Sequence, residues 1–230
     1  MELQFFRTDR IEDKLDKLVK VAWELLQRKI AGGLVKVNKE ASLQLHYAYI
    51  LQELISICQF SDAENVKVIL EKTIGMGGKN TQEIDVVIET TVNNTPYQVA
   101  IEMKCYRKYA SSGKLRGGIN EFVKEVYEDI ESLEKYRVLD TSIKKVYFLA
   151  MTDYENVVSP LNQSKDKAKA KTPKYRAYDI SNGFVLKGPK NINIPVSSKS
   201  VSIHINGKYT FDWTVVPFSA GNFYFLILEV

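Results

Sequence analysis

One short segment restricts the fold more than any other feature of this chain. Residues 145–151 read KVYFLAM, in which nearly every residue is apolar. A strand with one face in water alternates polar and apolar residues, whereas a strand covered on both faces is apolar throughout. The sequence therefore predicts a central strand here, with other elements packed on both of its faces.

The hydrophobic spacing elsewhere predicts a mixed α/β protein. Apolar residues recur at helical spacing in three segments, residues 11–29, 41–58 and 119–136. Residues 66–70, 83–89 and 97–104 instead have the character of strands, and a turn at residues 92–96 joins the last two. Between residues 39 and 151 the expected order is thus helix, three strands, helix, strand. Residues 1–38 form an N-terminal helical segment before it.

The C-terminal part is expected to be rich in strands. Residues 201–205, 209–216 and 223–230 are aromatic and β-branched, so we expect residues 177–230 to extend the same sheet within one domain of residues 1–230. The stretch before them, residues 165–176, holds six basic residues and one acid, for a net charge of 6 − 1 = +5. Such a stretch fits a solvated loop or a salt-sensitive DNA clamp.

Composition excludes several classes of protein and leaves the partner open. The 32 basic and 28 acidic residues give a net charge of only +4, so the total does not indicate nucleic acid. Two cysteines exclude a disulfide scaffold and a four-cysteine zinc site, and two histidines argue against a histidine-rich metal centre. Without a signal sequence or an apolar run of ~20 residues, we expect a cytoplasmic protein that does not enter a membrane.

Three residues on adjacent predicted strands are candidates for a catalytic site. Glu102 and Lys104 point to the same face of their strand, and Asp85 lies beside Glu102 if the two strands pair as a hairpin. Two neighbouring carboxylates repel unless a cation lies between them, and Mg²⁺ is commonly held by one or two carboxylates together with phosphate oxygens. A lysine beside them can orient or help deprotonate water and stabilise charge on phosphorus.

The spacing alone leaves two interpretations open. An acid, any residue and then lysine also occurs at Glu12 and Lys14, on an amphipathic helix where a solvated face explains it. The pair Glu102 and Lys104 fits a surface ion pair at a sheet edge as well as it fits a catalytic site. The acid on the partner strand, Asp85, is what favours catalysis.

In these residues the chain resembles the PD-(D/E)XK nuclease superfamily, whose members have a restriction-endonuclease-like fold. The matching residues are Asp85 in TQEIDVVIE and Glu102 and Lys104 in YQVAIEMKC, and the element order of residues 39–151 is also similar. Ile84 replaces the proline that gives the motif its name. The resemblance implies a nuclease that uses Mg²⁺ or Mn²⁺, with Asp85 and Glu102 as metal ligands and Lys104 as the catalytic lysine. It also implies DNA as the usual substrate, in restriction, repair or defence.

Further candidates surround this motif. Many members of the superfamily carry an acid on the helix before the strands, and Glu40 is the best match, although an acid at a helix N-terminus also interacts favourably with the helix dipole. Glu53 is an alternative on the same helix, and Gln44 is a weaker candidate for substrate binding. After Lys104 we expect a mobile basic loop, in which four side chains either grip the phosphate backbone or remain solvated: Arg107, Lys108, Lys114 and Arg116.

The function predicted from the sequence is metal-dependent endonucleolytic hydrolysis of DNA. One alternative is a nucleic-acid-binding or assembly protein that keeps the fold without activity, and another is a nuclease acting on RNA or branched DNA. Cuts on both antiparallel strands require two sites, which favours a homodimer. Tyr127, Asp129 and Glu134 on the later helix are assigned structural roles.

Overall fold

The apolar segment at residues 145–151 lies in β4 (Ile143–Thr152), a strand in the interior of a six-stranded sheet. The computed structural model describes residues 10–59, 64–78, 80–159, 179–196 and 199–230. Val146, Phe148 and Ala150 of β4 pack on one face of the sheet, and Tyr147 and Leu149 pack on the other, all of them fully buried. The prediction of a central strand covered on both faces is confirmed.

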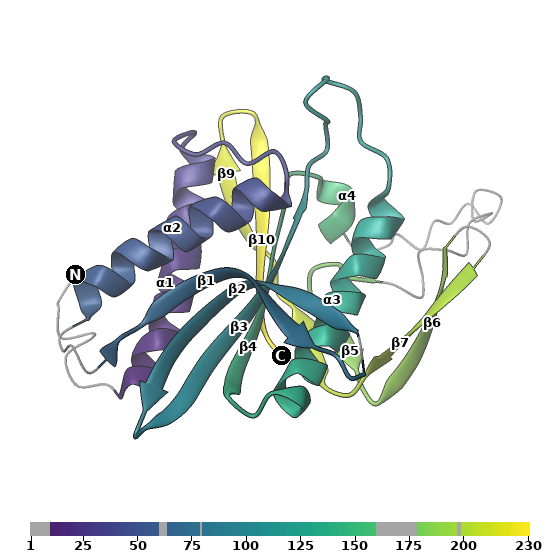
Figure 1. Ribbon diagram of the computed structural model, residues 1–230. Helices are drawn as coiled ribbons and strands as arrows, with labels where there is room; N and C mark the ends of the chain where they lie inside the picture. Colours follow the sequence, from purple (N-terminus) through teal and green to yellow (C-terminus); the bar gives the residue numbers. More distant parts are fainter. Residues whose placement is uncertain (1–9, 60–63, 79, 160–178, 197–198) are drawn as a thin grey trace.

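The sheet has the order β1-β2-β3-β4-β10-β9 (Figure 1). Its other strands are β1 (Lys67–Gly75), β2 (Thr81–Val92), β3 (Thr95–Tyr106), β9 (Thr214–Phe218) and β10 (Gly221–Glu229). β3 and β4 run parallel, and every other neighbouring pair is antiparallel. The crossover between the two parallel strands is helical, as expected for strands that no tight turn can join.

Helices cover both faces of this sheet (Figure 1). On one face α1 (Ile11–Ala31) packs on α2 (Glu40–Cys58), and their apolar stripes share a core with β2, β3, β4 and β10. On the other face lie α3 (Ile119–Leu139) and the short α4 (Glu155–Val158). The predicted α/β class is therefore confirmed. Among the described residues, no helix is long and apolar enough to cross a membrane.

The C-terminal strands differ from the expectation that all of them extend the sheet. Only β9 and β10 do so; β5 (Phe184–Lys187) pairs with β8 (Lys208–Phe211), and β6 (Lys190–Val196) pairs with β7 (Lys199–Ile205). The predicted strand at residues 209–216 is broken between β8 and β9 by Trp213. The indole of Trp213 is buried and donates to the Ile180 carbonyl at 2.7 Å, and its backbone N–H donates to Asn182 Oδ1 at 2.8 Å. These bonds turn the chain from one sheet into the other. The basic stretch 165–176 lies outside the described residues.

The hairpin of β2 and β3 fixes the register of the candidate residues. Asn93 and Asn94 form its two-residue turn with φ values of 50° and 61°, the left-handed pair that lets two strands join with their natural twist. Pairing continues from the turn as far as Val86 and Ile101. Beyond that pair β3 continues to pair with β4, so Asp85 lies where β2 leaves β3.

Candidate active site

Asp85 is held by hydrogen bonds to its backbone and its side chain. The Met103 backbone N–H of β3 donates to Asp85 Oδ2 at 2.7 Å, which ties the carboxylate to the strand that carries Glu102 and Lys104. The Gln44 side-chain amide, from α2, donates to the Asp85 carbonyl at 2.6 Å. Gln44 is buried in this contact, so its amide supports the position of Asp85.

Glu102 lies deeper than Asp85, on the face of β3 that α3 covers. Only 4% of Glu102 is exposed, and the fully buried Tyr136 of α3 donates its hydroxyl to Glu102 Oε1 at 2.7 Å. A buried carboxylate without a donor is costly, and this hydroxyl supplies one. The alternation along β3 places Lys104 on the same face as Glu102.

Lys104 is clamped between carboxylates that come from two helices. Its ammonium lies 3.0 Å from Glu40 Oε1, at the start of α2, and 3.3 Å from Asp129 Oδ2, on α3. Asp129 Oδ2 is buried, and it contacts the Lys104 ammonium as an ion pair rather than through a well-aligned hydrogen bond. Because α2 and α3 lie on opposite faces of the sheet, one lysine joins both helical layers at the open end of the β2–β3 pairing.

The cluster carries more negative than positive charge. Four carboxyl groups, those of Glu40, Asp85, Glu102 and Asp129, surround the single ammonium of Lys104, so the formal charge is 1 − 4 = −3 if all are ionised. Burial, followed by the charges of Asp129 and Asp85, raises the pKa of Glu102 well above its usual value. Burial also raises the pKa of Asp129, to about 8, although the Lys104 ammonium opposes this.

The same charges keep Lys104 protonated. Burial by itself lowers the pKa of the ammonium, but the carboxylates of Asp129 and Glu40 more than offset this and leave the pKa raised. Burial raises the pKa of Glu40 and of Asp85 as well, against Lys104 in the first case and against the Met103 N–H in the second. The cluster thus contains one charged ammonium, which is too little positive charge to balance four ionised carboxylates.

These residues fit a hard divalent cation. Within the described part of the chain, no three His, Cys, Asp or Glu side chains form a ready-made ligand group. Mg²⁺ needs no such group, since one or two carboxylates suffice when water and substrate phosphate oxygens complete its shell. Asp85 and Glu102 are the pair with adjacent carboxyls, and each has one oxygen outside the bonds to Met103 and Tyr136. Four acidic side chains share one ammonium, and this shortage of positive charge makes the pair suitable for a cation.

The structure separates the other candidates named from the sequence. Glu40 contacts Lys104, whereas Glu53 is exposed further along α2. The guanidinium of Arg107 is bound within the protein, by Asp153 at 2.9 Å and by the Val37 carbonyl, and it lies over the Phe223 ring. Lys108 also lies at the base of the loop, and its ammonium is above the rings of Tyr109 and Tyr154. Lys114 and Arg116 are on the returning arm of the loop, where the Arg116 backbone N–H donates to the Lys108 carbonyl at 2.8 Å.

Sequence reasoning missed Asp129 and Tyr136 as parts of this cluster. Asp129 was assigned a structural role, yet it contacts Lys104, and Tyr136 holds Glu102. A signal was available, because the two residues are two helical turns apart and lie on the stripe that also contains Val126 and Leu133. An acid on an apolar stripe is unusual enough to call for a partner.

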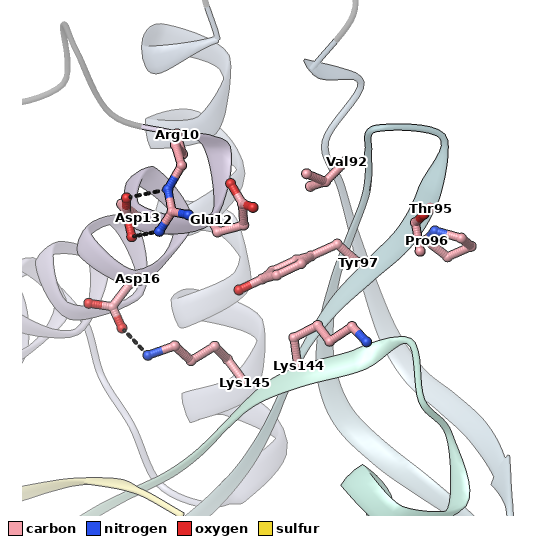
Figure 2. A pocket seen from close by; sticks show the side chains of 10 residues that line it. All are labelled: Arg10, Glu12, Asp13, Asp16, Val92, Thr95, Pro96, Tyr97, Lys144 and Lys145. Carbon is pink, nitrogen blue, oxygen red and sulfur yellow. Dashed lines mark hydrogen bonds and ion pairs between the residues drawn. The ribbon is translucent and has the colours of Figure 1, made fainter.

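A separate cavity of about 510 Å³ lies away from the carboxylates (Figure 2). It is between the start of α1 and the β2–β3 turn, and Tyr97 projects into it. Tyr97 is five residues from Glu102 along β3, or roughly 16 Å at the rise of a strand. Its lining has no net charge that would attract a phosphate, because it holds three acids and three bases: Glu12, Asp13, Asp16, Arg10, Lys144 and Lys145. We therefore place the candidate site at the carboxylate cluster.

Comparison with known proteins gives no relative for this arrangement. The chain matches no protein-family model, no curated protein and no solved structure. The candidate site therefore stands on its own geometry.

Proposed function

We propose that this protein is a metal-dependent nuclease that hydrolyses phosphodiester bonds in DNA. The observation that supports the proposal is the surplus of acidic side chains around one charged lysine, at the point where β2 leaves β3. A purely structural ion pair needs one acid for one base, whereas Lys104 has two acids in contact and a third, Asp85, close enough to act on its charge. The resemblance of Asp85, Glu102 and Lys104 to the PD-(D/E)XK motif supports the same reaction and DNA as the substrate.

Asp85 and Glu102 are the residues that would hold the metal. A bound Mg²⁺ or Mn²⁺ ion supplies positive charge to the phosphate and lowers the pKa of a coordinated water. Tyr136 and the Met103 N–H fix the orientation of the two carboxylates, which reduces the reorganisation needed when substrate arrives.

Lys104 acts as a donor in this proposal. Hydrolysis forms a bond from a water oxygen to phosphorus, breaks the bond from phosphorus to the leaving sugar oxygen, and moves one proton from the water to that oxygen or to solvent. Because its pKa is raised, Lys104 keeps its proton and stabilises the negative charge that grows on the phosphate oxygens. Glu40, with a side chain 39% exposed and 3.0 Å from Lys104, is the group through which the proton from water reaches solvent.

The test is cleavage of supercoiled plasmid and linear DNA with Mg²⁺, with Mn²⁺ and with a chelator. We expect cleavage only with metal, and its loss in Asp85→Asn and Lys104→Ala. Glu83→Gln and Lys124→Ala are matched controls, since Glu83 is an exposed acid two residues before Asp85 and Lys124 pairs with Glu121 at the start of α3. Both controls should cleave like the parent.

Metal binding gives a second, independent readout. Calorimetric titration of the parent with Mn²⁺ should show a site that Asp85→Asn removes and Glu83→Gln retains. The proposal is wrong if the parent protein cleaves neither DNA nor RNA and binds no divalent cation. That result would favour a binding protein with this fold, whereas cleavage confined to RNA would refute the choice of DNA.

A further inference from the structure

The basic loop after Lys104 forms a hairpin that its own backbone hydrogen bonds close. Residues 107–118, here called the finger, project from between β3 and α3 at the top of Figure 1. Three backbone hydrogen bonds close it: Arg116 N–H to the Lys108 carbonyl, Ala110 N–H to Lys114, and Gly113 N–H to Ala110, at 2.8–2.9 Å. Gly113 has φ +77°, the left-handed conformation that a hairpin turn of this length uses.

The base of the finger is fixed to the strand that carries the candidate site. The Tyr106 hydroxyl, at the end of β3, donates to the Arg116 carbonyl at 2.9 Å. Asp153 accepts from the Arg107 guanidinium at 2.9 Å and from the Lys108 backbone N–H at 2.6 Å. The finger therefore has a set direction relative to Lys104.

The finger presents apolar side chains to water. Tyr109 and Leu115 form its β-bridge, and directly paired residues project to the same face of a hairpin. Tyr109 is 53% exposed and Leu115 is 60% exposed, although a hairpin surface in water normally carries polar residues. The Lys108 ammonium lies 5.2 Å from the centre of the Tyr109 ring, which leaves much of the ring uncovered.

The charge of the finger favours nucleic acid as the occupant of this face. It contains four basic residues and no acid, and only Arg107 has an ion pair among the described residues. Nucleic acid matches both features at once, because it offers phosphates to the cations and flat bases to the exposed ring. Tyr109 is five residues beyond Lys104, so it is at most about 18 Å away along the chain, or roughly five nucleotide steps of 3.4 Å.

We infer that Tyr109 and Leu115 receive an unpaired base of the substrate close to the cleaved phosphate, so that forked or flapped DNA is preferred over continuous duplex. The inference rests on the proposed function, because the site supplies the phosphate to be cut. In a continuous duplex each base is stacked between its neighbours, and an aromatic side chain reaches its face only where pairing ends. Lys114 and Arg116 contact phosphates, which carry no information about pairing.

The experiment compares a perfect duplex with a forked duplex of the same sequence. Binding of the parent is measured by fluorescence anisotropy with a chelator present, and cleavage is measured with Mg²⁺. We expect the fork to be bound and cut at least tenfold better than the duplex. Tyr109→Ala should weaken binding of the fork by about 5- to 150-fold, the range for losing one base–aromatic stack, with little change for the duplex.

Three variants separate stacking from charge and from general damage. Tyr109→Phe should keep the preference for the fork, and Lys114→Ala should weaken both substrates by a similar factor. Tyr49→Ala is the matched control, because Tyr49 is a tyrosine on α2 that is 65% exposed, and it should behave like the parent.

Several outcomes would overturn the inference. These are equal binding of fork and duplex by the parent, equal weakening of both by Tyr109→Ala, or no binding of either. Self-association that Tyr109→Ala abolishes, seen by sedimentation, would assign the face to a second copy of the chain and also overturn it. If the preference holds in the binding assay without metal-dependent cleavage, only the nuclease proposal fails; if cleavage occurs without the preference, only this inference fails.

Discussion

Replacing Asp129 by asparagine should stabilise the protein at neutral pH. Asp129 is 9% exposed, and burial raises the pKa of its carboxyl from 3.8 to about 8 despite the contact with Lys104. The folded state therefore holds a proton that the unfolded state has released, and the stability of the parent falls as pH rises from about 4 to about 8. Asparagine has nearly the same shape and cannot ionise, so the variant lacks this loss.

The size of the effect follows from the pKa. At about 1.36 kcal/mol per pH unit, the proton that folded Asp129 retains costs the folded state at most about 4 kcal/mol at pH 7 and roughly 2 kcal/mol at pH 5. Because Glu102 and Asp85 compete for the same protons, we expect a gain of about 1–4 kcal/mol at pH 7 and close to zero at pH 4.

Urea unfolding with a chelator, at pH 4, 5, 7 and 8.5, measures this gain. Glu128→Gln is the control on the same helix, where a surface pair with Lys124 is worth 0–1 kcal/mol at most, so its effect should be small at every pH. A variant that is less stable than the parent at pH 7, or whose gain is largest at pH 4, would refute the assignment of Asp129 as a buried, uncompensated acid.

Two further substitutions test other contacts of α3. Tyr136→Phe removes the donor to buried Glu102. We expect the free energy of unfolding in urea to fall by about 1–3 kcal/mol and Mn²⁺ binding, measured by calorimetry, to weaken. Unchanged stability would contradict the role of this hydrogen bond. Burial favours a raised pKa at Glu134, but donors that include the Tyr209 hydroxyl and the Gly207 N–H leave the pKa lowered. The ionised carboxylate therefore stabilises the fold above its unfolded pKa, and this contribution is lost as pH falls through the folded pKa. Glu134→Ala should accordingly cost about 1–3 kcal/mol at pH 7 and less in acid; an equal cost at both pH values would show that packing, not the charge, matters.

The hydrophobic pattern was sufficient for the elements from α1 to β4. Each predicted helix and strand in this part is present, with bounds that differ by a few residues, because buried faces repeat at 3.6 residues in helices and at two in strands. The pattern failed after β4, where residues 209–216 read as one strand. The break at Trp213 depends on its bonds to Ile180 and Asn182, some thirty residues earlier, which no local pattern reports.

The sequence alone singled out Asp85, Glu102 and Lys104 as candidate site residues, from strand alternation and a hairpin turn. Those are local relations, carried by residues close together in the chain. The tertiary structure decided the rest: it brought Glu40, 64 residues away, and Asp129 to the same ammonium, and it buried the carboxyls enough to raise their pKa values. Burial and long-range charge depend on which layers meet, and only the packing of α2 and α3 on the two faces of the sheet sets them.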